Sequence, residues 1–70
     1  MTFHRIALIG LGLLGGSIGR AVKKYLPDVK ISGFDSNLIS LQKAYEIGFI
    51  DYQATSLTDV VQDADLVILA

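Results

Sequence analysis

The 70-residue chain lacks cysteine and tryptophan, and it has one proline and one histidine. Without cysteine it can form no disulfide, no thiolate metal site and no cysteine nucleophile. This composition fits a reducing compartment, so we expect a cytoplasmic location. Charge is sparse as well: six basic and seven acidic residues give a net charge of -1. No basic patch indicates nucleic-acid binding, and the acidic residues lack the spacing of a metal-binding loop.

The chain also lacks an apolar run long enough to cross a bilayer, which takes about 20 residues. Its longest uncharged stretch lies between Arg5 and Arg20 and has fourteen residues, five of them glycine. Each glycine weakens a helix by about 1 kcal/mol relative to alanine. No signal-peptide cleavage site follows the stretch. We therefore expect no membrane or secretion segment, and the glycines need another explanation.

Apolar patterning predicts four strands that alternate with three helices. Continuous apolar runs are typical of strands covered on both faces, whereas a 3.6-residue repeat indicates an amphipathic helix. The expected strands span residues 3–9, 29–34, 50–55 and 65–70. The expected helices span residues 13–26, 36–48 and 56–64. The order β-α-β-α-β-α-β predicts an α/β fold of the Rossmann type, with a parallel sheet in strand order 3-2-1-4 and helices on both faces.

Individual residues predict where the helices begin and end. Ser36 or Asn37 is expected to cap the second helix, and Ser56 the third. Pro27 ends the first helix, because the residue before a proline disfavours the helical conformation. Gly48 fits the C-terminal cap of the second helix.

Glycines form the pattern G-x-G-x-x-G directly after the first expected strand, in Gly10-Leu11-Gly12-Leu13-Leu14-Gly15. In dinucleotide-binding folds the first glycine permits a tight turn and the second lets a diphosphate approach the backbone. The third lets the helix pack close to the strand. The first-turn amides, near Leu13 and Leu14, have no partner within the helix and point at the anion. Residues 1–70 are therefore predicted to form a dinucleotide-binding domain.

The residues that follow the pattern favour packing. Gly15 and Gly19 share a helix face, so we expect close approach of the helix to the sheet. Ser17 can bond to the backbone locally or contact phosphate, and the local role is favoured. His4 precedes the first strand, far from the carboxyl ends of the strands where ligands bind, and receives no catalytic role.

Asp35 ends the second expected strand, twenty residues after Gly15. A carboxylate at this place accepts hydrogen bonds from the adenosine ribose hydroxyls. It also repels a 2′-phosphate: at about 4 Å and an effective dielectric near 20, two unit charges cost about 4 kcal/mol. We therefore expect NAD rather than NADP as the cofactor. Ser36 beside it can contact the ribose or adenine, or cap the next helix.

Four segments together resemble the amino-terminal region of prephenate and arogenate dehydrogenases, the TyrA family. They are IALIGLGLLGGSIG, GFDSN, LQKAYEIGFID and ADLVILA, and they span almost the whole chain. The form G-L-G-L-L-G-G-S, with Gly16-Ser17 after the third glycine, is the most specific part. The resemblance implies that Gly10, Gly12, Leu13, Leu14 and Gly15 face the pyrophosphate and that Asp35 faces the ribose. It also implies that Ala70 lies on the nicotinamide side.

The family transfers a hydride from a cyclohexadienyl ring to NAD(P) with loss of carbon dioxide, and it serves tyrosine biosynthesis. The resemblance therefore implies the NAD-binding part of such an enzyme, with a cyclohexadienyl substrate and a homodimeric full-length protein. The family's catalytic histidine, its substrate-binding arginine and its dimerisation domain have no counterpart in these residues. We expect no catalytic residue here and a domain incomplete at its C-terminus.

Two alternatives stay open at the level of sequence. The glycine turn is shared with other NAD-dependent oxidoreductases, such as hydroxyacid and imine reductases. A non-catalytic NAD-sensing domain would also need no catalytic group. A separate expectation concerns the fourth strand, which lies at the edge in the 3-2-1-4 order: an apolar edge invites pairing with another chain, so we expect the 70 residues alone to self-associate.

Overall fold

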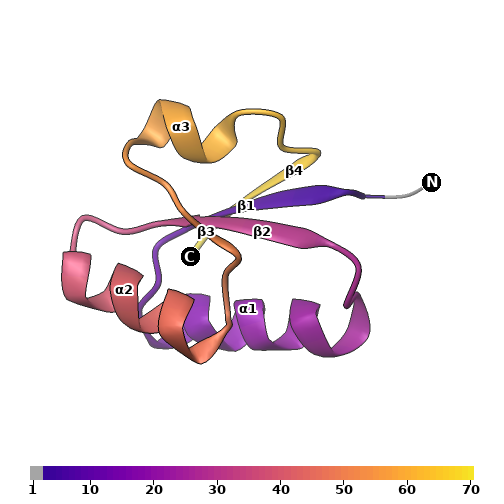
Figure 1. Ribbon diagram of the computed structural model, residues 1–70, viewed down its shortest axis with the longest axis horizontal. Helices are drawn as coiled ribbons and strands as arrows, with labels where there is room; N and C mark the ends of the chain where they lie inside the picture. The colour runs from indigo at the N-terminus through magenta and orange to yellow at the C-terminus, as the bar shows by residue number, and fades with distance from the viewer. Residues whose placement is uncertain (1–2) are drawn as a thin grey trace.

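The computed structural model describes residues 3–70, and within them the four strands and three helices follow the predicted order (Figure 1). The elements are β1 (Arg5–Ile9), α1 (Leu13–Tyr25), β2 (Lys30–Phe34), α2 (Leu38–Ile47), β3 (Tyr52–Gln53), α3 (Leu57–Val61) and β4 (Leu66–Leu69). All strand pairs are parallel, and the sheet has the order β3-β2-β1-β4. The Rossmann-type topology predicted from the sequence is confirmed.

The third strand and the third helix are shorter than predicted. β3 has two residues, because only Ser32 and Gly33 of β2 pair with it. α3 has five residues and ends at Val61 rather than at residue 64. Gln62 has extended backbone angles and Asp63 a φ of 60°, so the helical path cannot continue through them.

The helices α2 and α3 begin and end largely at the capping residues that the sequence predicts. Of the two candidate caps for α2, Asn37 fills the role: its side chain accepts hydrogen bonds from the amides of Ile39 and Ser40. Ser56 caps α3 by accepting from the Asp59 amide at 3.0 Å. Gly48 ends α2 in the left-handed conformation, with a φ of 96°. These caps fix the loops between strands and helices.

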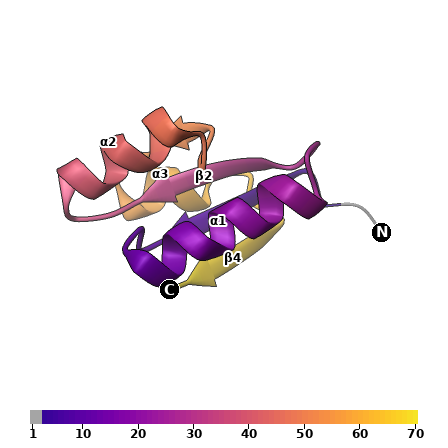
Figure 2. The same ribbon diagram turned by 90° about the horizontal axis from the view of Figure 1, so that it is seen from below.

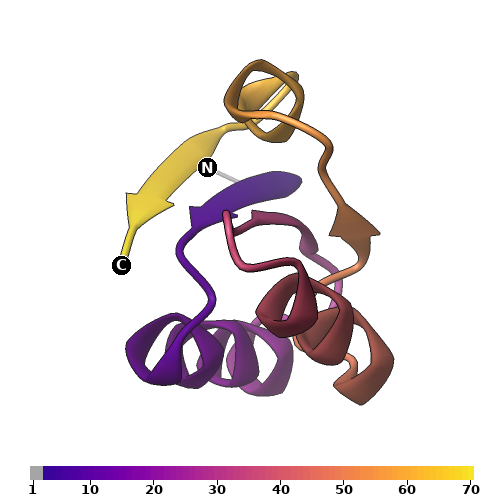
Figure 3. The same cartoon turned by 90° about the vertical axis from the view of Figure 1, so that its left-hand side faces the viewer.

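Helices cover both faces of the sheet, two on one side and one on the other (Figures 1 and 3). Seen from below, α1 and α2 lie side by side across the strands (Figure 2). On this face the core is formed by Leu8, Leu11, Ile31, Leu41, Ala44 and Ile50. A smaller core under α3 contains Ala7, Ala54 and Val60, and Val60 has no exposed surface.

β4 lies at the edge of the sheet and pairs with β1 alone, as the predicted order requires. Its apolar side chains remain accessible: Val67 is 45% and Leu69 77% exposed. Within the described residues, no helix has both the length and the apolar character needed to cross a membrane.

Candidate nucleotide-binding site

The glycine turn lies between β1 and α1, at the carboxyl edge of the sheet. Two neighbouring strand ends hold it there. The Gly10 amide donates to the Phe34 carbonyl of β2 at 2.9 Å. The Ala70 amide, just after β4, donates to the Ile9 carbonyl at 2.9 Å. Figure 3 looks toward this edge of the sheet and shows the turn leading from the end of β1 down into α1.

Two of the three motif glycines are required by the fold itself. Gly10 has a φ of 95°, and a Cβ there would lie 2.6 Å from the Ala70 carbonyl oxygen. A Cβ on Gly15 would lie 1.8 Å from the Gly10 carbonyl oxygen. Gly19 shows the same closeness one turn later, at 2.9 Å from the Phe49 carbonyl oxygen. These glycines do allow close approach of α1, but the nearest atoms belong to the turn and to the loop after α2, and the nearest sheet atom is on the Leu8 side chain, 3.6 Å from a Cβ at Gly19.

Gly12 is different, because nothing in the chain requires a glycine there. Its backbone is extended, with a φ of -71°, and so lies outside the left-handed region that favours glycine. Apart from Gly12 itself and its two chain neighbours, no atom lies within 4 Å of the place a Cβ would take. The turn therefore has open space directly above the backbone of Gly12, where a ligand can approach the main chain.

The first amides of α1 follow Gly12 directly and have no partner within the helix. The first amide to bond within α1 is that of Gly16, which donates to the Gly12 carbonyl at 2.9 Å. The amides of Leu13, Leu14 and Gly15 precede that bond, and the first turn contains no acidic residue. Leu13 is 93% exposed. Free amides and the positive end of the helix dipole can hold an anion here.

Asp35 follows β2, and its carboxylate reaches the glycine turn. Oδ2 accepts a hydrogen bond from the Leu11 amide at 2.7 Å. Oδ1 accepts one from the Asn37 amide at 2.8 Å. The sequence predicts that Asp35 contacts the ribose, but no pattern in it indicates the bond to Leu11. Because each carboxylate oxygen can accept two hydrogen bonds, one position on each remains for a ribose hydroxyl.

The other predicted site residues lie around the turn. Ser36 is exposed next to Asp35, and Asn37 rather than Ser36 caps α2. The Ala70 carbonyl lies against Gly10. Ser17 donates its hydroxyl to the Leu13 carbonyl at 3.1 Å, which is the local bond favoured from the sequence.

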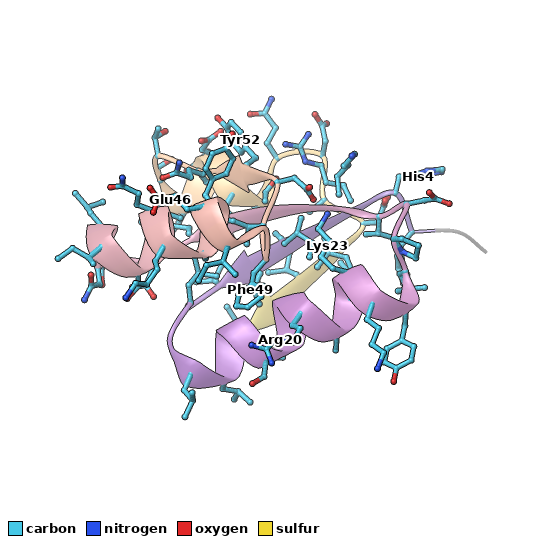
Figure 4. All side chains as sticks on the ribbon, turned by 60° about the horizontal axis from the view of Figure 1, so that its bottom comes forward. His4, Arg20, Lys23, Glu46, Phe49 and Tyr52 are labelled. Atoms are coloured by element: carbon cyan, nitrogen blue, oxygen red, sulfur yellow. The ribbon has the colours of Figure 1, made fainter. Side chains whose placement is uncertain are left out.

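A cleft of about 330 Å³ opens beside the turn, between α1 and α2. Its lining includes Gly12, Ser17, Arg20, Lys43 and Phe49. The Arg20 guanidinium lies 5.2 Å from the centre of the Phe49 ring (Figure 4). Neither Asp35 nor Ala70 lines the cleft, so it is a neighbour of the glycine turn and not the path between the two ends of a dinucleotide.

The carboxyl groups with shifted pKa are those of Asp51, Asp59 and Asp65, and none of them belongs to the glycine turn. Burial raises the pKa of Asp51, but the hydrogen bonds from Lys23 and the Ile31 amide outweigh it and the pKa is lowered. Lys23 and Asp51 form an ion pair. His4 directly precedes β1, at the amino-terminal edge of the sheet (Figure 4). Among residues 3–70 no three histidine or acidic side chains are grouped so as to hold a metal ion.

Comparison with known proteins gives consistent matches. Residues 18–70 match the family described as the nucleotide-binding domain of prephenate dehydrogenase. The chain is 42% identical over 68 residues to cyclohexadienyl dehydrogenase of Zymomonas mobilis, covering 97% of the chain and 23% of that protein. It is 43% identical over 65 residues to prephenate dehydrogenase of Bacillus subtilis, covering 93% and 18%. The chain belongs to the prephenate dehydrogenase family.

A solved structure of a prephenate dehydrogenase supports the assignment at the level of the fold. The enzyme from A. aeolicus, in complex with hydroxyphenyl propionate and NAD+, superimposes with a TM-score of 0.88 and 31% sequence identity. The match covers 99% of this chain and 24% of that one. The chain thus spans a quarter or less of the length of these relatives.

Proposed function

We propose that the chain is the NAD-binding part of an enzyme that oxidatively decarboxylates prephenate or arogenate. The open space at Gly12 carries the proposal, because the fold explains Gly10 and Gly15 without a ligand but does not explain Gly12. A diphosphate resting on the main chain does explain it. Membership of the prephenate dehydrogenase family supplies the reaction class.

The residues described here would bind and orient the cofactor. The amides of Leu13 and Leu14 would donate to the diphosphate, and Asp35 would accept from the ribose hydroxyls. Bound NAD+ supplies the hydride acceptor: the ring of the substrate loses a hydride and its carboxyl group leaves as carbon dioxide. The groups that touch the substrate are proposed to lie elsewhere in the complete protein.

The proposal includes a preference for NAD over NADP. A 2′-phosphate would meet the carboxylate of Asp35, at a cost of about 4 kcal/mol for two unit charges about 4 Å apart at an effective dielectric near 20. A cytoplasmic location, a role in tyrosine biosynthesis and a homodimeric complete enzyme also belong to the proposal. The biosynthetic role and the homodimer depend on the resemblance to the family, and the location depends on the absence of cysteine.

Calorimetry and turnover of the complete protein test the proposal. NAD should bind more tightly than NADP, and prephenate or arogenate should yield NADH and carbon dioxide in equal amounts. Gly12→Val should weaken NAD binding at least about tenfold, or about 1.4 kcal/mol, without loss of folding. Gly16→Ala is the matched control, because a Cβ there makes only an ordinary contact of 3.8 Å with Phe49.

Each failure has a distinct meaning. Binding of NAD without turnover of either ring substrate would favour an NAD-sensing role over an enzyme. Unchanged affinity in Gly12→Val would show that the diphosphate does not rest on this turn. Equal affinity for NAD and NADP would reject the role of Asp35 in cofactor choice.

A further inference from the structure

The carboxylate of Asp35 already accepts hydrogen bonds from the protein backbone when no nucleotide is bound. Both of its oxygens accept backbone amides: Oδ2 from Leu11 at 2.7 Å and Oδ1 from Asn37 at 2.8 Å. Leu11 lies inside the glycine motif, and Asn37 begins α2. The Asp35 side chain thus connects two parts of the fold. One is the glycine turn, which is expected to hold the diphosphate, and the other is the start of α2.

The hydrogen bond from the Leu11 amide to Asp35 is a side-chain contact that connects the glycine turn to the end of β2. The adjacent contact is made by the main chain, from the Gly10 amide to the Phe34 carbonyl at 2.9 Å. The Leu11 side chain is buried in the core under α1 and α2, so its amide cannot turn toward solvent without disturbing that packing. Without Asp35 the half-buried amide would lose its acceptor, which costs more than an ordinary exposed hydrogen bond.

From these contacts we infer that Asp35 is a positioning residue for the glycine turn in addition to contacting the ribose. It holds the Leu11 amide so that the backbone from Gly10 to Gly12 stays in the conformation that admits a diphosphate. Recognition of the ribose and recognition of the diphosphate are therefore coupled through one carboxylate. The identity of the ligand in this inference rests on the proposed function, whereas the contact between Asp35 and Leu11 does not.

The coupling has a consequence for cofactor choice. Removing the charge of Asp35 removes the repulsion of a 2′-phosphate, but it also releases the turn that both cofactors share. Replacement of Asp35 alone should therefore weaken NAD without raising NADP to the affinity that NAD has in the parent protein. An asparagine preserves the shape but has one acceptor oxygen in place of two, and its NH2 group would face an amide donor.

An NAD analogue without hydroxyls on the adenosine ribose separates the two roles of Asp35. The analogue cannot bond to the carboxylate, so a residue that acts through the ribose alone would not affect its binding. We expect Asp35→Asn in the complete protein to weaken the analogue about tenfold, or about 1.4 kcal/mol. Asp28→Asn, which removes an exposed carboxylate from the α1–β2 connection, is the matched control and should change nothing.

Hydrogen exchange of the Leu11 amide tests the contact without any nucleotide. We expect exchange at least about tenfold faster in Asp35→Asn than in the parent protein or in Asp28→Asn. This result would support the positioning role even if the parent protein failed to bind NAD, which would reject the proposed function alone. Unchanged exchange would overturn the inference, as would an analogue that binds equally well to Asp35→Asn and the parent.

Folding of the variants is checked by thermal unfolding. Should Asp35→Asn fail to fold, Asp35→Ser retains one short acceptor and repeats both measurements. Loss of folding in both variants would contradict the inference, because a contact to one amide of the turn predicts a local effect.

Discussion

At the scale of single residues, the three motif glycines do different work. Gly10 and Gly15 relieve clashes within the chain, and Gly12 leaves space that the chain does not use. The sequence pattern predicted a different role for each glycine: the turn for Gly10, the diphosphate for Gly12 and helix packing for Gly15. It could not indicate which atoms exclude a side chain, and these are the Ala70 carbonyl oxygen at Gly10 and the Gly10 carbonyl oxygen at Gly15.

Gly15→Ala is expected to destabilise the chain by about 1–3 kcal/mol or more, the usual cost of overpacking. The added methyl group would lie 1.8 Å from the Gly10 carbonyl oxygen, and main-chain atoms cannot move aside as a flexible side chain does. Gly16→Ala, one position later, should be neutral or slightly stabilising, because alanine favours a helix over glycine by about 1 kcal/mol. Urea unfolding of the two variants gives the comparison, and equal free energies of unfolding would contradict it.

Asp35 shows how much of the site the sequence can predict. Its position after a strand and its distance from Gly15 predicted a place beside the nucleotide, and the structure does bring it to the turn. Its bond to the Leu11 amide was not predictable, because no sequence pattern reports which backbone amide a carboxylate will reach. The contacts of Asp65 were not predictable for the same reason: its carboxylate accepts hydrogen bonds from the amides of His4 and Arg5.

At the scale of elements, prediction succeeded where a local cause acts within a few residues. The helix caps at Ser56 and Gly48 and the helix end before Pro27 all depend on immediate neighbours. The lengths of β3 and α3 were overestimated, because they depend on tertiary contacts. β3 is limited by its pairing with two residues of β2, and α3 is held to the sheet by the buried side chain of Val60.

Asp65 joins the start of β4 to the start of β1, and this contact should depend on pH. Hydrogen bonds from the His4 amide first, and then from Arg5, lower the pKa of Asp65 below its ordinary value of 3.8. A carboxyl with a lower pKa in the folded state stabilises the fold above the unfolded value and loses that effect as the pH falls through the folded value. Asp65→Asn should therefore be less stable than the parent at pH 7, and the difference should shrink below pH 3.8.

Urea unfolding at neutral and acid pH measures that difference. Asp28→Asn removes the same charge from a position with no comparable amide contacts and is the control. A gap between Asp65→Asn and the parent that stays constant from neutral pH into acid would contradict the role of the ionised carboxylate.

At the scale of the whole molecule, β4 is one of the two edge strands in the sheet that residues 3–70 form, and most of its apolar side chains are exposed. β4 was expected at this position because the strand order could be derived from the alternation of strands and helices. The exposed apolar side chains of Val67 and Leu69 agree with that expectation.

We expect the 70-residue chain to self-associate through β4. Leu69→Lys should weaken this association about tenfold or more, equivalent to about 1.4 kcal/mol, because a charged residue on an edge strand opposes pairing. Leu38→Lys alters a side chain of similar exposure, 72% against 77%, but on a helix, so it should leave the association unchanged. Sedimentation over a range of concentrations tests both variants, and a monomeric parent chain would reject the expectation.

The neutral character of the turn has a consequence for how the site responds to its surroundings. A lysine or histidine that held a phosphate would gain or lose a proton as conditions changed, but a peptide N–H does not titrate in the physiological range. The turn from Gly10 to Gly15 contains no ionisable side chain. The diphosphate contact proposed for this turn should therefore be constant across neutral pH, and any acid or alkaline limit on cofactor affinity should originate in side chains outside the turn.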